Sequence, residues 1–118
     1  MSQLKDVLAD LAKVEGVLAA LVVSRDGFVV EGVTSEESVD LEAVGAIVAS
    51  NIAAADSMGR EMVRGTIRNL LLEFDEGPVA IGPAGPDAML VVVGGKQANL
   101  GRIRLEMRRN SQLAAALV

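Results

Sequence analysis

The sequence of 118 residues is long enough for one domain, spanning 1–118, with a buried core, and it contains no cysteine and no histidine. The missing thiol and imidazole groups exclude disulfides, thiolate metal sites, cysteine nucleophiles, the usual serine triads and zinc catalysis. The net charge of −5 opposes non-specific binding to nucleic acid, and without Tyr or Trp the chain has almost no platform on which single-stranded bases could stack.

The first third of the chain predicts a helix followed by a β-hairpin. Apolar residues recur at helical spacing at Leu4, Val7, Leu8 and Leu11. This helix, over residues 2–14, is ended by Gly16. The apolar run 17–23 is typical of a strand buried on both faces, and residues 28–33 return from it through the hairpin signal Asp-Gly. Charges scattered through the N-terminal helix leave no apolar run of signal-peptide length, so we expect a soluble cytoplasmic protein.

Residues 38–64 are expected to form a long helix, around which the rest of the domain is organised. Its apolar face consists of Leu41, Val44, Val48, Ile52, Ala55, Met58 and Met62. Ser38 can cap its first turn. Arg60 and Arg64 lie near the C-terminal end, where the helix dipole favours cations. Gly65 then ends the helix.

The same helix carries a second stripe of very small side chains. Its members are Ala46, Ser50, Ala53 and Ser57. A helix that is apolar or small nearly all round requires burial on two sides. Its own sheet can cover one side, and a second copy of the helix can cover the other, because small side chains let two helix backbones approach closely. The sequence therefore predicts a core helix that is also the seam of a homodimer.

Two alternatives compete with the dimer seam. A membrane span needs about 20 mostly apolar residues, but polar residues such as Asp40, Glu42 and Asp56 interrupt this run, so no membrane insertion is expected. A monomer could instead cover the small stripe with its own terminal helices. Asn51 and Asp56 are the unexpected polar residues, and we favour a role in dimer register for Asn51 and contact with a partner for Asp56.

The second half of the chain predicts three more strands and a closing helix. The strands fall at 66–74, 79–81 and 88–93, separated by the turn sequences Asp-Glu-Gly-Pro and Gly-Pro-Ala-Gly-Pro-Asp. The closing helix has an apolar face made of Leu100, Ile103, Met107 and Ala114. Hairpin turns within each group of strands imply an antiparallel sheet, and strands that are apolar on both faces imply helices on both sides. The fold class is α/β of the α+β kind.

Three motifs that suggest a ligand have simpler explanations. Around VVVGGKQ, the preceding Leu90 and the final Gln97 stand where a phosphate loop needs Gly and Ser or Thr. The glycines of GPAGPD precede a strand and not a helix, so no nucleotide or other cofactor is expected. The closing helix is basic, with Arg102, Arg104, Arg108 and Arg109. Solvation of an exposed helix face explains these arginines most simply, and binding of an acidic partner is the alternative.

Three stretches of the sequence resemble the Roadblock / dynein light chain family over essentially the whole chain. VEGVLAALVVSRDGFVVEG resembles the first hairpin of that family, and LEAVGAIVASNIAAADSMG resembles its long Ala-rich helix. LLLEFDEGPVAIGPAGPDAMLVVVGGKQANLGRIRLEMRR resembles the closing strands and helix. The resemblance implies a longin-like (profilin-like) α-β-β-α-β-β-β-α fold with sheet order 2-1-5-4-3.

The resemblance also implies a dimer and a partner. In the two-fold dimer of this family the long helices pack together and the third strands pair. The interface expected here comprises Ala46, Ser50, Asn51, Ala53, Ser57, Leu70 and Leu72. Bacterial and archaeal members are often partners of Ras-like GTPases, and some activate them. We expect a non-enzymatic homodimeric regulator that docks a small Ras-like GTPase through Asp56, Arg60 and Arg64. The alternative is a purely structural dimerisation scaffold in a larger signalling or motor complex.

Overall fold

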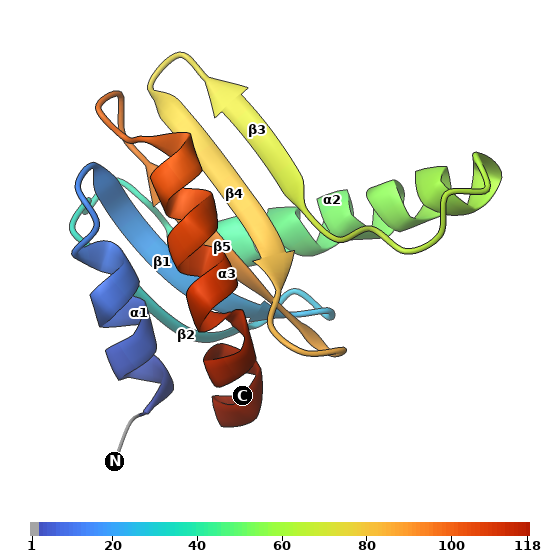
Figure 1. Ribbon diagram of the computed structural model, residues 1–118, viewed down its shortest axis with the longest axis horizontal. Helices are drawn as coiled ribbons and strands as arrows, with labels where there is room; N and C mark the ends of the chain where they lie inside the picture. The colour runs from blue at the N-terminus through green and yellow to red at the C-terminus, as the bar shows by residue number, and fades with distance from the viewer. Residues whose placement is uncertain (1–2) are drawn as a thin grey trace.

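The computed structural model describes residues 3–118 (Figure 1). Along the chain it contains α1 (Leu4–Ala12), β1 (Val17–Ser24), β2 (Val29–Thr34), α2 (Leu41–Glu61), β3 (Leu70–Phe74), β4 (Gly77–Pro83), β5 (Ala88–Gly94) and α3 (Leu100–Leu117). The expected order of helices and strands is confirmed. Within the described residues, no helix is both long enough and apolar enough to span a bilayer.

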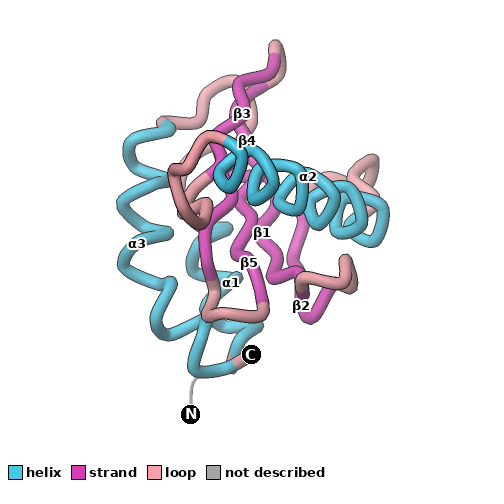
Figure 2. Tube along the Cα trace, turned by 90° about the vertical axis from the view of Figure 1, so that its right-hand side faces the viewer, coloured by secondary structure: helices cyan, strands magenta, loops and turns pink. Residues whose placement is uncertain are grey.

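The five strands form one sheet in the order β2-β1-β5-β4-β3, in which every neighbouring pair is antiparallel. This is the order that the family resemblance implied. Each of the three hairpins β1–β2, β3–β4 and β4–β5 is closed by a short turn, as the Asp-Gly, Asp-Glu-Gly-Pro and Gly-Pro-Ala-Gly-Pro-Asp sequences predicted. Figure 2 shows the layers: α1 and α3 lie on one face of the sheet, and α2 crosses the other.

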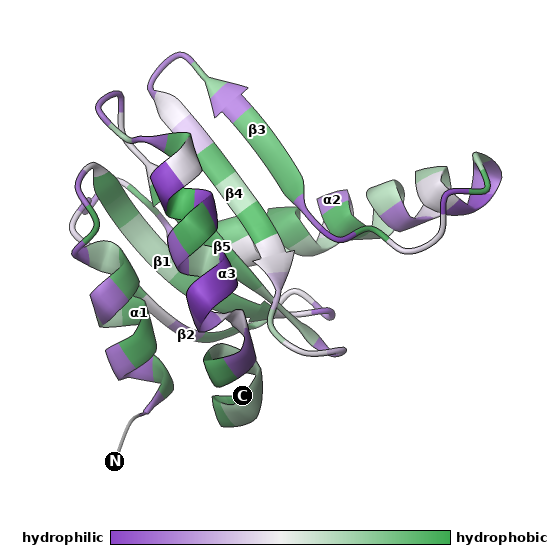
Figure 3. Ribbon diagram, viewed as in Figure 1, coloured by the Kyte–Doolittle hydropathy of each residue, from purple (hydrophilic) through white to green (hydrophobic). Residues whose placement is uncertain are grey.

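The two faces of the sheet carry separate hydrophobic clusters. Under α1 and α3 the fully buried side chains include Leu8, Leu90 and Ile103. Under α2 the cluster includes Leu21 and Val91. The central strands β1 and β5 contribute to both clusters, which explains why their sequences are apolar throughout (Figure 3).

The long helix begins and ends inside the range predicted for it. Its N-cap is Asp40 and not Ser38, because the chain first makes a turn after β2, in which the N–H of Val39 donates to the carbonyl oxygen of Glu36. Oδ1 of Asp40 accepts hydrogen bonds at 3.1 and 3.2 Å from the two N–H groups that lie two and three positions further along the chain.

The C-terminal end of α2 also differs from the prediction. The helix ends at Glu61, four residues before Gly65, and Val63 takes a left-handed conformation with φ of +55°. The N–H of Arg64 then donates to the carbonyl oxygen of Gly59 at 2.7 Å, so the connection to β3 turns back along the helix. Residues 66–69 belong to this connection, and β3 begins only at Leu70.

The helix α2 extends past the edge of the sheet. Figure 1 shows α2 running behind the sheet and projecting past the edge strand β3. Val48 and Ile52 are buried against the sheet, as predicted, but Met58 and Met62 are each 59% exposed. These two methionines were expected on the core face, and that expectation is wrong because no strand lies under this part of the helix.

Candidate functional site

The small side chains of α2 form an exposed stripe on the side of the helix that faces away from the sheet. Its members are Ala46, Ser50, Ala53 and Ser57. Both terminal helices lie on the opposite face of the sheet, so the chain does not cover this stripe with its own α1 or α3. The alternative in which a monomer buries the stripe by itself is therefore wrong. We call this surface, together with the exposed Ile47 and Asn51, the α2 stripe.

Asn51 lies in the α2 stripe and is exposed. Its side-chain Nδ2 donates to the carbonyl oxygen of Ile47, one turn earlier, at 3.0 Å. This bond holds the amide against its own helix. Ile47 is 60% exposed, so a large apolar side chain adjoins the small ones on this surface.

The edge strand β3 borders the same face of the sheet. It is hydrogen-bonded to β4, and within the described residues its outer edge pairs with no strand. Leu70 and Leu72 stand opposite Ile81 and Val79, so they point to the α2 side, where both are half-buried. An unpaired edge with apolar neighbours is a ready site for pairing with another chain.

The projecting end of α2 exposes apolar side chains, two arginines and Glu61. Met58 and Met62 are exposed there, and Val63 is 85% exposed. Arg60 and Arg64 are exposed in the same segment. The structure thus brings Arg60 to the end of the helix, as predicted, and places Arg64 in the connection that follows it.

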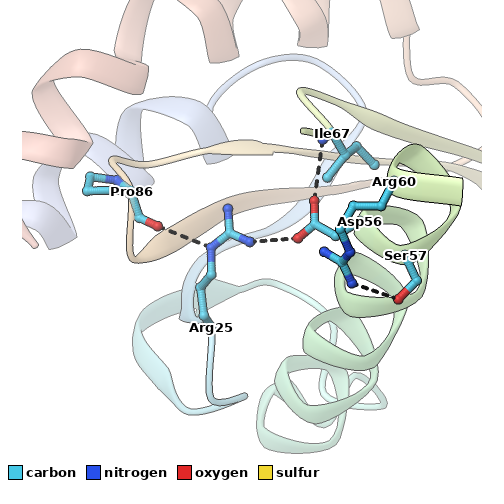
Figure 4. A network of polar contacts seen from close by, with 6 residues as sticks. All are labelled: Arg25, Asp56, Ser57, Arg60, Ile67 and Pro86. Carbon is cyan, nitrogen blue, oxygen red and sulfur yellow. Dashed lines mark hydrogen bonds and ion pairs between the residues drawn. The ribbon is translucent and has the colours of Figure 1, made fainter. Parts of the chain in front are cut away.

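The side chain of Asp56 belongs to a polar network within the chain (Figure 4). Its Oδ2 lies 3.1 Å from Nη1 of Arg25, and its Oδ1 accepts a hydrogen bond from the N–H of Ile67 at 3.3 Å. Nε of Arg25 donates to the carbonyl oxygen of Pro86 at 3.1 Å. The network joins α2 to the β1–β2 hairpin, the β4–β5 turn and the connection to β3.

This network changes the role expected for Asp56. Its side chain is only 19% exposed, and both carboxylate oxygens already have partners in the chain. Arg60 instead donates to the hydroxyl oxygen of Ser57 at 3.2 Å on the exposed side. Asp56 and Arg60 both line a shallow hollow of about 320 Å³ beside Arg25. Arg25, in the hairpin Ser-Arg-Asp-Gly, was not singled out from the sequence, because no local pattern connects it with a residue 31 positions later.

Removing the charge of Asp56 is expected to weaken the polar network that joins α2 to the rest of the domain. In the variant Asp56→Asn, the free energy of unfolding should fall by about 1–2 kcal/mol, because a charge-assisted bond is lost from a mostly buried carboxylate whose partner is partly exposed. Chemical denaturation measures this change. The control Arg60→Gln removes an exposed bond and should cost less than about 0.5 kcal/mol. If Asp56→Asn is as stable as this control, the network does not stabilise the fold.

The chain is similar to known proteins along nearly its whole length. The model of the Roadblock/LC7 domain family matches residues 3–94. The uncharacterised protein MJ1340 of Methanocaldococcus jannaschii is 34% identical over 111 residues, which is 94% of this chain and 96% of that protein.

Two solved structures share the fold. The gliding protein MglB of Thermus thermophilus superimposes with a TM-score of 0.87 at 24% identity, covering 97% of this chain and 87% of that one. A Roadblock/LC7 domain of Streptomyces avermitilis superimposes with a TM-score of 0.87 at 20% identity, covering 98% and 97%.

Proposed function

The chain belongs to the Roadblock/LC7 domain family, and on that premise we propose that it is a non-enzymatic, homodimeric regulator of a small Ras-like GTPase. The observation that carries the proposal is the exposed α2 stripe beside the unpaired edge of β3. A contiguous exposed face of small and apolar side chains next to an edge strand favours a protein partner.

A second copy of the chain is the partner that we propose for the α2 stripe. A two-fold axis brings identical surfaces together, and the small side chains of Ala46, Ser50, Ala53 and Ser57 let the two helix backbones approach closely. The two β3 edges can pair across the same axis. Ala46, Ser50, Asn51, Ala53, Ser57, Leu70 and Leu72 would lie in this interface.

The GTPase is proposed to dock on the projecting ends of the two α2 helices. In a dimer these ends form a shared surface, with Met58 and Met62 supplying apolar contact and Arg60 and Arg64 supplying charge. A Ras-like GTPase presents switch loops whose order depends on the bound nucleotide. A surface that touches those loops prefers one nucleotide state, and it raises turnover if it favours the hydrolysis-competent arrangement.

A pull-down experiment tests the proposal. The bait is this protein, and the prey is each Ras-like GTPase of the same organism, loaded with GDP or with a non-hydrolysable GTP analogue. We expect one nucleotide state to be recovered preferentially. The double variant Arg60→Glu/Arg64→Glu should lower that recovery about tenfold, because it reverses two charges at the contact. Both positions are exposed, so the variant should stay folded.

The matched control is Lys5→Glu/Lys13→Glu, which makes the same change of net charge on α1 and at its C-cap, on the opposite face of the sheet. It should recover the GTPase as the wild type does. Equal recovery of both nucleotide states by all three proteins would reject the regulator and favour a dimerisation scaffold.

A further inference from the structure

A second hollow lies on the face of the sheet away from α2. It has a volume of about 540 Å³ and is bounded by β3 and β4 on one side and α3 on the other. Its apolar lining includes Leu71, which is 37% exposed, and the edge of Met107, while Ala80 and Leu90 lie buried beneath it. Figure 1 shows why it exists: α3 runs over the middle of the sheet and leaves β3 uncovered on this face. Its size falls within the range of about 300–1,000 Å³ usual for ligand sites.

Three arginines surround this hollow. Arg104 and Arg108 lie one turn apart on α3, and Arg68 lies across from them, just before β3. All three are exposed, and no acidic residue lines the hollow. Over residues 3–118, none of the three is within 4.0 Å of a carboxylate, whereas Arg109 on the same helix pairs with Glu106 at 3.1 Å. A chain with a net charge of −5 therefore concentrates unpaired positive charge at one place.

We propose that this groove, lined by Arg68, Arg104 and Arg108, binds an acidic segment of a partner protein in extended conformation. The guanidinium group binds carboxylates through two parallel hydrogen bonds. Arg104 and Arg108 are separated by a rise of about 6 Å along α3, and alternate side chains of an extended segment recur at about 6.6 Å. Carboxylates at alternate positions thus match the two arginines, while apolar side chains reach Leu71 and Met107.

The groove is independent of the proposed dimer. Pairing of two β3 strands would use the outer backbone edge of β3 and not the side of the sheet that faces α3. The α2 stripe lies on the other face altogether (Figure 2). A partner can therefore occupy the groove whether or not the chain dimerises, and a failure of the dimer test leaves this proposal standing.

Fluorescence polarisation tests the groove with a fluorescein-labelled peptide, Gly-Ser-Glu-Leu-Glu-Leu-Glu-Ser-Gly. We expect saturable binding to the full chain. The same peptide with Gln in place of Glu should bind at least about tenfold more weakly, because each charge-assisted hydrogen bond is stronger than a neutral one. The variant Arg104→Gln/Arg108→Gln should weaken binding of the acidic peptide by a similar factor. Gln is nearly as good a helix former as Arg, so α3 should remain intact.

The control variant is Arg109→Gln, which removes a charge from the same helix outside the groove and should bind the acidic peptide like the wild type. No saturable binding by the wild type would overturn the proposal, and so would equal affinity of the wild type and the double variant. Displacement of the peptide by millimolar inorganic phosphate would assign the groove to a small anion. Preferential binding to phosphatidylserine vesicles through the same arginines would assign it to a membrane surface. Either result would overturn the peptide as occupant.

Discussion

Replacing Ala53 with glutamate is expected to turn a dimer of this chain into a monomer. Ala53 is exposed in the middle of the α2 stripe, between Ser50 and Ser57. Across a two-fold axis the new carboxylate would meet its own copy at the row of small side chains, where the two helices would approach most closely. Burying two like charges without partners should raise the dissociation constant of the dimer by about a hundredfold or more, a change of roughly 3 kcal/mol.

Sedimentation velocity at micromolar concentration measures the result. The matched control is Ala116→Glu, which makes the same chemical change at an exposed position of α3 on the other face of the sheet and should leave the dimer intact. Circular dichroism should show folded protein for both variants, because the wild-type chain does not bury either side chain. A monomeric wild type at this concentration would contradict the proposed dimer. A fully dimeric Ala53→Glu variant would show that Ala53 does not lie in the dimer interface.

Replacing Gly77 with alanine is expected to lower the free energy of unfolding by about 3 kcal/mol or more, from strain and overpacking together. Gly77 begins β4 with φ of +134°, a conformation that L side chains rarely adopt. A Cβ atom there would overlap the carbonyl oxygen of Gly94 and would lie 2.5 Å from the backbone of Gly95. Both belong to the end of β5 and the turn after it, so the backbone itself would have to move.

Gly65→Ala separates these two costs. Gly65 also has a positive φ, of +86°, but nothing lies within 4 Å of the position that its Cβ would take. It should therefore show the conformational cost alone, about 1 kcal/mol. Thermal unfolding at one fixed protein concentration compares the two variants, and Gly77→Ala should melt about 10 °C below the wild type. Equal melting temperatures for the two variants would show that β4 and β5 can separate without penalty.

The two faces of the sheet differ in the kind of surface they offer. On the α2 face, the side chains of the α2 stripe are mostly small and uncharged, and the edge strand β3 borders them. These features suit a contact with a second copy of the chain. The α3 face carries three arginines around a hollow with both polar and apolar lining residues, which suits a chemically different partner. Both surfaces can be mutated independently, because no residue belongs to both.

Local pattern was enough to predict most of the elements. The run Val17–Val23 and the run Ala88–Val93 predicted the two central strands, since a strand buried on both faces is apolar at every position. The spacing of Ile103, Met107 and Ala114 identified the buried face of α3. Hairpin turns implied the antiparallel sheet. The sheet order came from the family resemblance and not from these patterns.

The candidate site depended on distances that no local pattern contains. The helical repeat assigned Met58 and Met62 to the core face, because it reports direction around the helix axis and not the width of the sheet below. The sheet ends at β3, so the two methionines, although they follow the same helical repeat, are exposed at the end of α2. Asp56 shows the same limit: its burial comes from Arg25 and Ile67, which the folded chain brings to it from other elements.

By itself, the sequence determined the elements, the composition of the α2 stripe and the basic side of α3, because these follow from side-chain chemistry at fixed spacing along the backbone. Tertiary structure alone decided that both terminal helices pack on one face, leaving the α2 stripe exposed, and that α3 leaves a groove beside β3. These features follow from where α1, α2 and α3 cross the sheet, and that placement is set by contacts between residues far apart in the chain.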